Sequence, residues 1–331
     1  MNKKRVLSGI RATGRLHLGN YLGAVKGMLE LQNPSAGSGQ VYETFYMVAD
    51  VHTITTPYKT EELRKNRREV IIDYLSAGLN PNASVIFQQS EVAEHLELAF
   101  FLSSVVTIAK MQHLPTFKDK VKQYPQNSTM ALLNYPILMA ADILIYKAEL
   151  VPVGIDQEPH LEVAREIARR FNTDYGTNFP EPKRFVTKGE YVPSLTGEGK
   201  MSKTVEGSYI NLTDTLDEIK GKIARIPTDS GLGEEITGGV KSLMELIELF
   251  ISRERREMLE QEYKTIGIRY GDIKSELSEA IFKEIEPIQK KRAEFENDPA
   301  LVDRIINEGN EKAREAARET IKEVKEKMGL S

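Results

Sequence analysis

Short apolar runs alternate with longer amphipathic stretches through the first half of the chain. Residues 5–10, 44–50 and 84–89 are compact apolar runs that favour buried strands. Between them, residues 17–32 and 60–79 carry apolar side chains at helical spacing. The pattern predicts an α/β fold, with a Rossmann-like parallel sheet covered by helices on both faces.

Further along, residues 128–150 form a long apolar helical stretch, and residues 151–153 a short strand. An amphipathic helix is predicted over residues 156–172, where Asp156 is placed as its cap. Thr60 is placed in the same way before the helix that follows it.

From about Ser208 the pattern becomes mainly helical. We therefore expect a Rossmann-like catalytic domain over residues 1–207 and a helical C-terminal domain over residues 208–331, with the last helix of the chain packing back on the catalytic domain.

Composition narrows the possible chemistry. The 331 residues carry a formal net charge of −4 and include no cysteine, which excludes disulfides, zinc–cysteine sites and thiol nucleophiles. The first residues lack the apolar run of a secretory signal, and no apolar stretch reaches membrane-spanning length. We expect a cytoplasmic protein with no membrane association and no strong global attraction for nucleic acid.

The first candidate site follows the first predicted strand, where parallel sheets bind ligands. There the chain reads HLGN, with His17, Gly19 and Asn20 at the start of a helix. A lone histidine in this position is more often a helix cap than a catalytic group. Glycines that allow close approach and a helix N-terminus nevertheless favour a nucleotide phosphate site.

A second candidate is the glycine-flanked stretch GKMSKT, in which Lys200 and Lys203 lie three residues apart. A solvated charged turn is the usual meaning of such a stretch. Two lysines in a glycine-rich loop would also suit the far end of a polyphosphate.

Taken together, HLGN and KMSKT resemble the paired ATP-binding motifs of class I aminoacyl-tRNA synthetases, H-I-G-H and K-M-S-K-S. Asn20 replaces the second histidine and Thr204 the last serine. Residues 135–172 resemble the bacterial tryptophanyl branch of that family, and residues 8–24 and 226–230 also fit it.

That resemblance implies an amino-acid site built around Asp142, whose carboxylate would accept the indole N–H of L-tryptophan. An indole nitrogen only donates, so an ionised carboxylate is a suitable partner. The family also implies contacts to the ring from Leu7, Met139, Val151 and Val153, a lining role for His52, and contacts near the ammonium group from Gln157 and Tyr135. Leu7 is smaller than the phenylalanine that the family often has there.

The resemblance likewise implies an ATP site. Its reaction is the activation of tryptophan by ATP and transfer to tRNA(Trp), by a homodimer, with Mg²⁺ carried on ATP and no metal ligands from the chain. The implied catalytic residues are His17, Asn20, Lys120, Lys200, Ser202 and Lys203, and the other nucleotide contacts are Arg11, Ala12, Thr13, Gly19, Gly154, Ile155, Asp156, Val192, Met201 and Thr204.

Three other interpretations stay open. A tyrosyl-tRNA synthetase shares the fold and both ATP motifs, and a phenol would also meet a carboxylate. A non-catalytic synthetase-like module would be free to lose His17 and the two lysines, which are present. A small nucleotidyltransferase of the same superfamily would not need the long helical C-terminal region.

Overall fold

The computed structural model describes residues 3–34, 41–187, 189, 191–203 and 205–331. Its chain forms two compact units. One comprises Met1–Gly14, Gly27–Val186 and Asp298–Ser331, and the other Arg15–Lys26 and Thr187–Asn297. The boundary expected between residues 207 and 208 does not coincide with this division.

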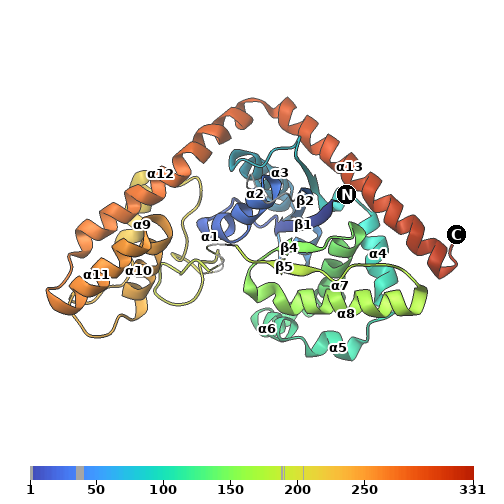
Figure 1. Ribbon diagram of the computed structural model, residues 1–331, viewed down its shortest axis with the longest axis horizontal. Coiled ribbons are helices and arrows are strands. Elements are labelled where there is room, and N and C mark those ends of the chain that lie inside the picture. The colour runs from blue at the N-terminus through green and yellow to red at the C-terminus, as the bar shows by residue number, and fades with distance from the viewer. Residues whose placement is uncertain (1–2, 35–40, 188, 190, 204) are drawn as a thin grey trace. The chain divides into compact units, whose positions relative to one another are not determined.

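The first unit is built on a five-stranded sheet in the order β3-β2-β1-β4-β5, and every neighbouring pair is parallel (Figure 1). This confirms the predicted α/β class. The strands are β1 (Lys4–Arg11), β2 (Tyr42–Ala49), β3 (Ser84–Gln88), β4 (Leu150–Pro152) and β5 (Lys183–Phe185).

Helices connect these strands and cover the sheet (Figure 1). The sequence predicted Thr60 as the cap of α3, but the helix already begins at Thr60. Lys59 is the extended residue that precedes it. The helices are α2 (Lys26–Gln32), α3 (Thr60–Ser76), α4 (Glu94–Ser103), α5 (Ile108–His113), α6 (Pro115–Gln123), α7 (Met130–Ile145), α8 (Glu158–Tyr175) and α13 (Pro299–Met328).

Short helical turns follow the carboxyl ends of several strands in this unit. They are η2 (Val51–Thr55) after β2, η3 (Gln89–Glu91) after β3 and η5 (Ile155–Gln157) after β4. A further turn, η4 (Pro125–Asn127), joins the helices α6 and α7.

Helix α13 packs against the edge strand β3 and against α4. Gly309 allows the close approach, because a Cβ atom there would lie 1.8 Å from the carbonyl oxygen of Ile86. Next to it, Asn310 Oδ1 accepts a hydrogen bond from the backbone N–H of Gln88 at 2.9 Å. A helix from the end of the chain thus covers a sheet edge that would otherwise present unpaired backbone groups.

The second unit is mainly helical. It contains the start of the first predicted helix, as α1 (Leu18–Asn20) and the π-helical turn η1 (Tyr21–Val25). Its other helices contact one another in the pairs α9–α12, α10–α11 and α10–α12; they are α9 (Leu216–Ala224), α10 (Gly238–Phe250), α11 (Arg253–Thr265) and α12 (Tyr270–Asn297).

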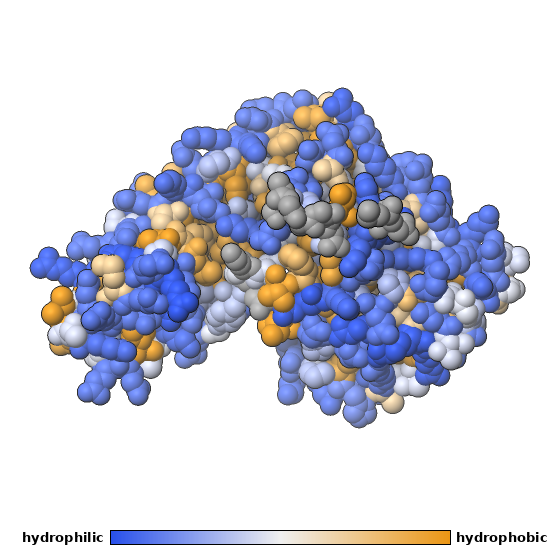
Figure 2. Space-filling model, in the orientation of Figure 1, coloured by the Kyte–Doolittle hydropathy of each residue, from blue (hydrophilic) through white to orange (hydrophobic). Residues whose placement is uncertain are grey.

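No helix in the described part of the chain is long and apolar enough to cross a membrane. On the face visible in Figure 2, hydrophilic residues predominate and hydrophobic ones form small groups between them.

Candidate functional site

The strand order places a switch point beside β1, which pairs with β2 on one side and with β4 on the other. Connections leave in opposite directions there, and ligands of such sheets bind at this crevice, beyond the carboxyl ends of the strands. Arg11 and Ala12 end or follow β1, and Gly154 and Ile155 follow β4. Predicted site residues from distant parts of the sequence therefore share one sheet edge.

Asp142 lies on α7 and has no exposed surface. Its Oδ2 lies 2.7 Å from His52 Nε2 on η2. Its Oδ1 accepts from Gln89 Nε2 at 2.8 Å and lies 2.6 Å from His95 Nδ1 on α4. The structure thus joins two predicted site residues, Asp142 and His52, and adds Gln89 and His95, which sequence reasoning missed.

The surroundings of Asp142 keep its carboxylate ionised. Burial on its own would raise its pKa, but the positive charge of His52 and hydrogen bonds from His52 and His95 outweigh that effect and lower the pKa to about 2. A buried, ionised acceptor is suited to a neutral donor such as an indole or a phenol.

An apolar wall belongs to the same unit. The four residues expected to contact the substrate ring all lie in or against one hydrophobic core cluster. Leu7 and Val151 are buried, from the neighbouring strands β1 and β4, while Met139 and Val153 are partly buried against the cluster. The sequence thus placed these four side chains in one region; their contact with a substrate stays a prediction.

Tyr135, another predicted residue, bonds to a histidine that sequence reasoning missed. Its hydroxyl lies 2.7 Å from His160 Nε2, and Thr116 Oγ1 lies 3.1 Å from the same nitrogen. Burial lowers the pKa of His160, although Asp156 opposes the shift. His160 lies three residues after Gln157 in the sequence QEPH, and this spacing could have indicated it as a site residue.

Asp156 is not the cap of α8. The helix begins at Glu158 with Gln157 before it, and Asp156 lies in the 3-10 turn η5. This turn moves the helix start beyond the reach of Asp156, whose Oδ2 instead accepts from Gln157 Nε2 at 2.8 Å. Pro159 lies in the first turn, where proline is tolerated.

Lys120, on α6, donates to Gln123 Oε1 at 2.8 Å. Burial and repulsion by Arg11 lower the pKa of Lys120. The two cations are therefore close enough to influence one another, which is the arrangement expected around an anionic ligand. This partial burial distinguishes Lys120 from a fully exposed surface lysine.

In the second unit, His17 precedes α1 and is buried, with 7% of its surface exposed. Its backbone N–H donates to Asn20 Oδ1 at 3.3 Å. Gly19 is required by this arrangement, because a Cβ atom there would lie 2.8 Å from His17 Cε1 and 2.9 Å from Nδ1. The histidine, glycine and asparagine of HLGN are thus one packed element.

The lysine loop lies beside His17 in the same unit. Lys203 Nζ donates to the carbonyl oxygen of Arg15. Burial, and then the charges of Lys203 and Lys200, lower the pKa of His17 to about 4. The hydrogen bond between Lys203 and Arg15 spans 188 positions. The two motifs, which are distant in the sequence, therefore lie together, as predicted.

Backbone bonds hold the loop itself. The N–H of Met201 donates to the carbonyl of Val192 at 2.8 Å, and both residues are buried. The N–H of Ser202 donates to Ser208 Oγ at 3.2 Å. Gly199 has a φ of +72°, which a side chain would strain. Thr204, also predicted to contact the nucleotide, lies outside the described residues.

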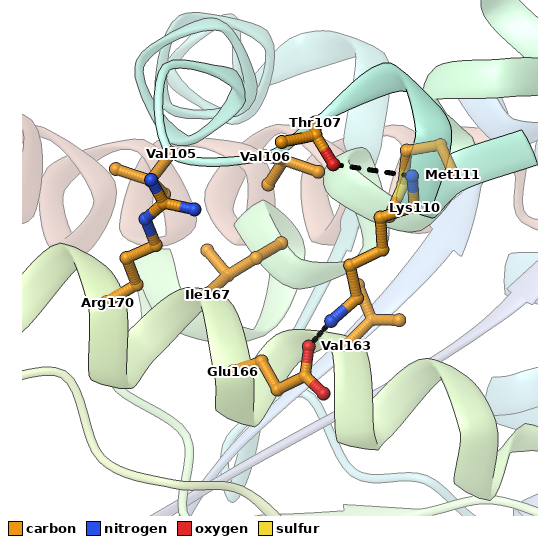
Figure 3. A pocket seen from close by; sticks show the side chains of 9 residues that line it. All are labelled: Val105, Val106, Thr107, Lys110, Met111, Val163, Glu166, Ile167 and Arg170. Carbon is orange, nitrogen blue, oxygen red and sulfur yellow. Dashed lines mark hydrogen bonds and ion pairs between the residues drawn. The ribbon is translucent and has the colours of Figure 1, made fainter. Parts of the chain in front are cut away.

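The described residues of the first unit line a small hollow and a larger groove. A small one of about 100 Å³ lies between α8 and the start of α5, where Lys110 pairs with Glu166 (Figure 3). None of the predicted site residues lines it. A larger apolar groove of about 270 Å³ runs along α4, α7 and η2, and Tyr135 lines it.

Comparison with known proteins gives consistent results. The family described as tRNA synthetases class I (W and Y) matches residues 1–286. A tryptophan–tRNA ligase of Helicobacter pylori is 42% identical over 100% of both chains, and one of Porphyromonas gingivalis is 39% identical over 98% of this chain and 99% of its own.

Solved structures agree with this. Tryptophanyl-tRNA synthetase of Campylobacter jejuni, complexed with ADP and tryptophan, matches with a TM-score of 0.82 and 32% identity, covering 98% of this chain and 100% of its own. Tyrosyl-tRNA synthetase of Archaeoglobus fulgidus matches with a TM-score of 0.68 and 20% identity, covering 88% and 90%, which shows the shared fold alone.

Proposed function

Because the chain belongs to the class I tRNA synthetases of the tryptophan and tyrosine group, we propose that it is a tryptophan–tRNA ligase. It activates L-tryptophan with ATP to tryptophanyl-adenylate and pyrophosphate, and then transfers tryptophan to tRNA(Trp). The full-length identity to tryptophan–tRNA ligases carries this assignment, and the buried, ionised Asp142 supplies an acceptor suited to the indole N–H.

In the first step, the substrate carboxylate attacks the α-phosphorus of ATP and pyrophosphate leaves. The substrate itself is the nucleophile, so the enzyme's contribution is positioning and stabilisation of charge. Asp142 would accept the indole N–H, while Gln157 and Tyr135 would meet the ammonium group. These contacts orient the carboxylate without any covalent intermediate on the protein.

Charge on the phosphates would be met by cations from the chain. Lys200 and Lys203 would stabilise the leaving pyrophosphate, and Lys120 with Arg11 would attract the triphosphate. His17, held neutral at pH 7, would offer a ring N–H rather than a positive charge. The remaining nucleotide contacts stay proposals as named from the sequence.

Mg²⁺, in this proposal, arrives on the triphosphate and supplies charge neutralisation there. Among the described residues, no group of three or more histidine or acidic side chains is placed to hold a metal ion. The catalytic work assigned here to the protein's own residues is binding and orientation.

The helices α9–α12, within the predicted C-terminal region 208–331, would read the tRNA anticodon. Cytoplasm is the proposed location, where protein biosynthesis takes place.

A homodimer is the proposed assembly, with the α4–α7 groove as its interface. Phe100 is 77% exposed and Leu96 52% exposed at this groove, an unusual amount for large apolar side chains. A second copy would cover both and stiffen α7, which carries Tyr135 and Asp142. Phe100→Asp should shift the mass in solution from dimer to monomer, whereas a wild-type monomer would contradict this proposal.

Amino-acid-dependent ATP–pyrophosphate exchange tests the proposed activity, with tryptophan, tyrosine and phenylalanine compared at equal concentration. Exchange with tryptophan alone is expected. Exchange with tyrosine would keep the fold and mechanism but overturn the assigned specificity. A folded protein that exchanges with none of the three would support the non-catalytic alternative.

A further inference from the structure

His95 is a buried histidine that the mechanism above does not use. It has no exposed surface, and both ring nitrogens have partners. Nδ1 lies 2.6 Å from Asp142 Oδ1, and Nε2 lies 2.8 Å from the hydroxyl of Tyr146. Three side chains from α4 and α7 thus form a continuous hydrogen-bonded row.

The direction of the hydrogen bond between His95 and Asp142 can be assigned. Burial, and then the negative charges of Asp142 and Glu94, raise the pKa of Tyr146 well above its usual value, so its hydroxyl keeps its proton. An ionised Asp142 only accepts, so His95 must donate to it from Nδ1. His95 Nε2 lies 2.8 Å from the hydroxyl of Tyr146, so a hydrogen bond on the other side of the ring fixes its orientation.

The row determines which part of Asp142 faces a ligand. A carboxylate offers about four acceptor positions. Gln89 and His95 occupy both positions on Oδ1, and His52 occupies one on Oδ2. Among the described residues, three of the four acceptor positions of Asp142 are therefore occupied. The remaining one is the second position on Oδ2, next to the bond with His52.

We propose that His95, oriented by Tyr146, is a positioning residue for tryptophan selection, because it holds Oδ1 of Asp142 and so turns Oδ2 toward the indole N–H. This inference rests on the function proposed for Asp142. It extends that function to a residue that does not touch the substrate.

Packing alone would give His95 a structural role, and the test must separate the two. Its ring lies 5.9 Å from that of Phe87 and 5.4 Å from that of Tyr146, between ring centroids. Tyr146 in turn stacks on Phe45 at 4.4 Å. Variants that keep the bulk of the side chain but remove its hydrogen bonds are therefore needed.

His95→Leu fills the same space with an apolar side chain and removes both hydrogen bonds of the ring. Tyr146→Phe keeps the aromatic ring and removes only the hydroxyl group. His95→Asn is the conservative variant, since its amide nitrogen can replace Nδ1 as donor to Asp142. His113→Leu is the matched control, because His113 is an exposed histidine of α5 in the same unit.

The readout is a ratio of kcat/KM values in ATP–pyrophosphate exchange. Tryptophan is compared with β-(3-benzothienyl)alanine, which has sulfur in place of the indole N–H. A loss of positioning lowers this ratio, whereas a general loss of stability lowers both values together. KM for ATP serves as a second internal reference.

The wild-type enzyme should prefer tryptophan strongly. The ratio should fall roughly ten- to hundred-fold in His95→Leu and about three-fold in Tyr146→Phe, as expected for hydrogen bonds to a charged group. His95→Asn should stay within about three-fold of the wild type, and His113→Leu should not change the ratio.

An unchanged ratio in a folded His95→Leu variant, or in Tyr146→Phe should His95→Leu fail to fold, overturns the inference. A fall of the kcat/KM ratio in Asp142→Asn but not in these variants would also overturn the inference. The proposed function would then stand. A wild-type protein without tryptophan exchange would instead contradict the proposed function itself.

Discussion

The surroundings of Asp142 and those of His17 solve opposite problems. Around Asp142, polar atoms from η2, η3 and α4 meet in the interior and satisfy one another. Around His17, two lysines come from an irregular loop in which Gly197, Gly199 and Gly207 all have positive φ. Selection of one substrate side chain requires an acceptor that is held rigidly and shielded from water. Binding of a polyphosphate requires cationic side chains that can adjust to the phosphate groups.

The largest expected effect comes from Asp142. In Asp142→Asn, the amide would turn a donor toward groups that themselves donate, and the negative charge would be lost. We expect kcat/KM for tryptophan to fall roughly a thousand-fold in pyrophosphate exchange, with KM for ATP nearly unchanged.

Asp174→Asn is the matched control for that variant, since Asp174 is a partly exposed aspartate on α8. It should behave as the wild type does. An equal loss of tryptophan use and ATP binding in Asp142→Asn would make Asp142 a structural residue only.

Lys203 probes the other region. Lys203→Ala should lower kcat for activation about a hundred-fold and leave tryptophan binding nearly intact, because its charge is needed when pyrophosphate leaves. Single-turnover adenylate formation and tryptophan binding measure the two separately. Lys241→Ala, an exposed lysine of α10, is the control, and an unchanged kcat in Lys203→Ala would remove the loop from the mechanism.

Gly19 tests how tightly HLGN is packed. In Gly19→Ala the new Cβ would displace the ring of His17, and we expect kcat to fall about ten-fold. Gly221→Ala is the control, and we expect it to stabilise the protein rather than to impair it. A Cβ at this position of α9 meets nothing within 4 Å, so helix propensity should stabilise the protein by up to about 1 kcal/mol. Full activity in Gly19→Ala would show that His17 need not be held in place.

The smallest effect near neutral pH concerns His17. Its pKa is about 4 when folded and 6.5 at the ordinary value, so below pH 6.5 the unfolded chain binds the extra proton first. Stability should therefore fall with decreasing pH between 6.5 and 4, by roughly 3 kcal/mol in total for this one group. Denaturant unfolding of wild type and His17→Asn should diverge over this window, and parallel curves would contradict the assignment.

Sequence patterns predicted four of the five strands, several main helices and the crevice at the end of β1, because buried strands and amphipathic helices leave periodic signals. They did not predict the three-residue strand β5 or the helices α4, α5 and α6. Sequence patterns and the family resemblance together indicated Asp142, a charge within an apolar helix. They missed Gln89 and His95, whose bonds to Asp142 span 53 and 47 residues and depend on the sheet being assembled.

The helix caps show a different limit. Thr60 and Asp156 have suitable side chains, but the actual starts are displaced by one or two residues, in one case by the turn η5. The two compact units divide the chain differently from the expected boundary after residue 207, for a related reason. Residues 15–26 continue a helical pattern without interruption, yet they belong with the second unit.

The cover that α13 provides for β3 has a consequence for synthesis of the protein. The strand emerges from the ribosome more than 200 residues before Gly309 and Asn310, so its edge stays uncovered through most of translation. Prematurely terminated chains would keep that edge exposed and aggregate, which solubility of a chain ending at Asn297 would measure. Closure of this sheet edge therefore waits until α13 has been synthesised, so that the edge gains its protection late in translation.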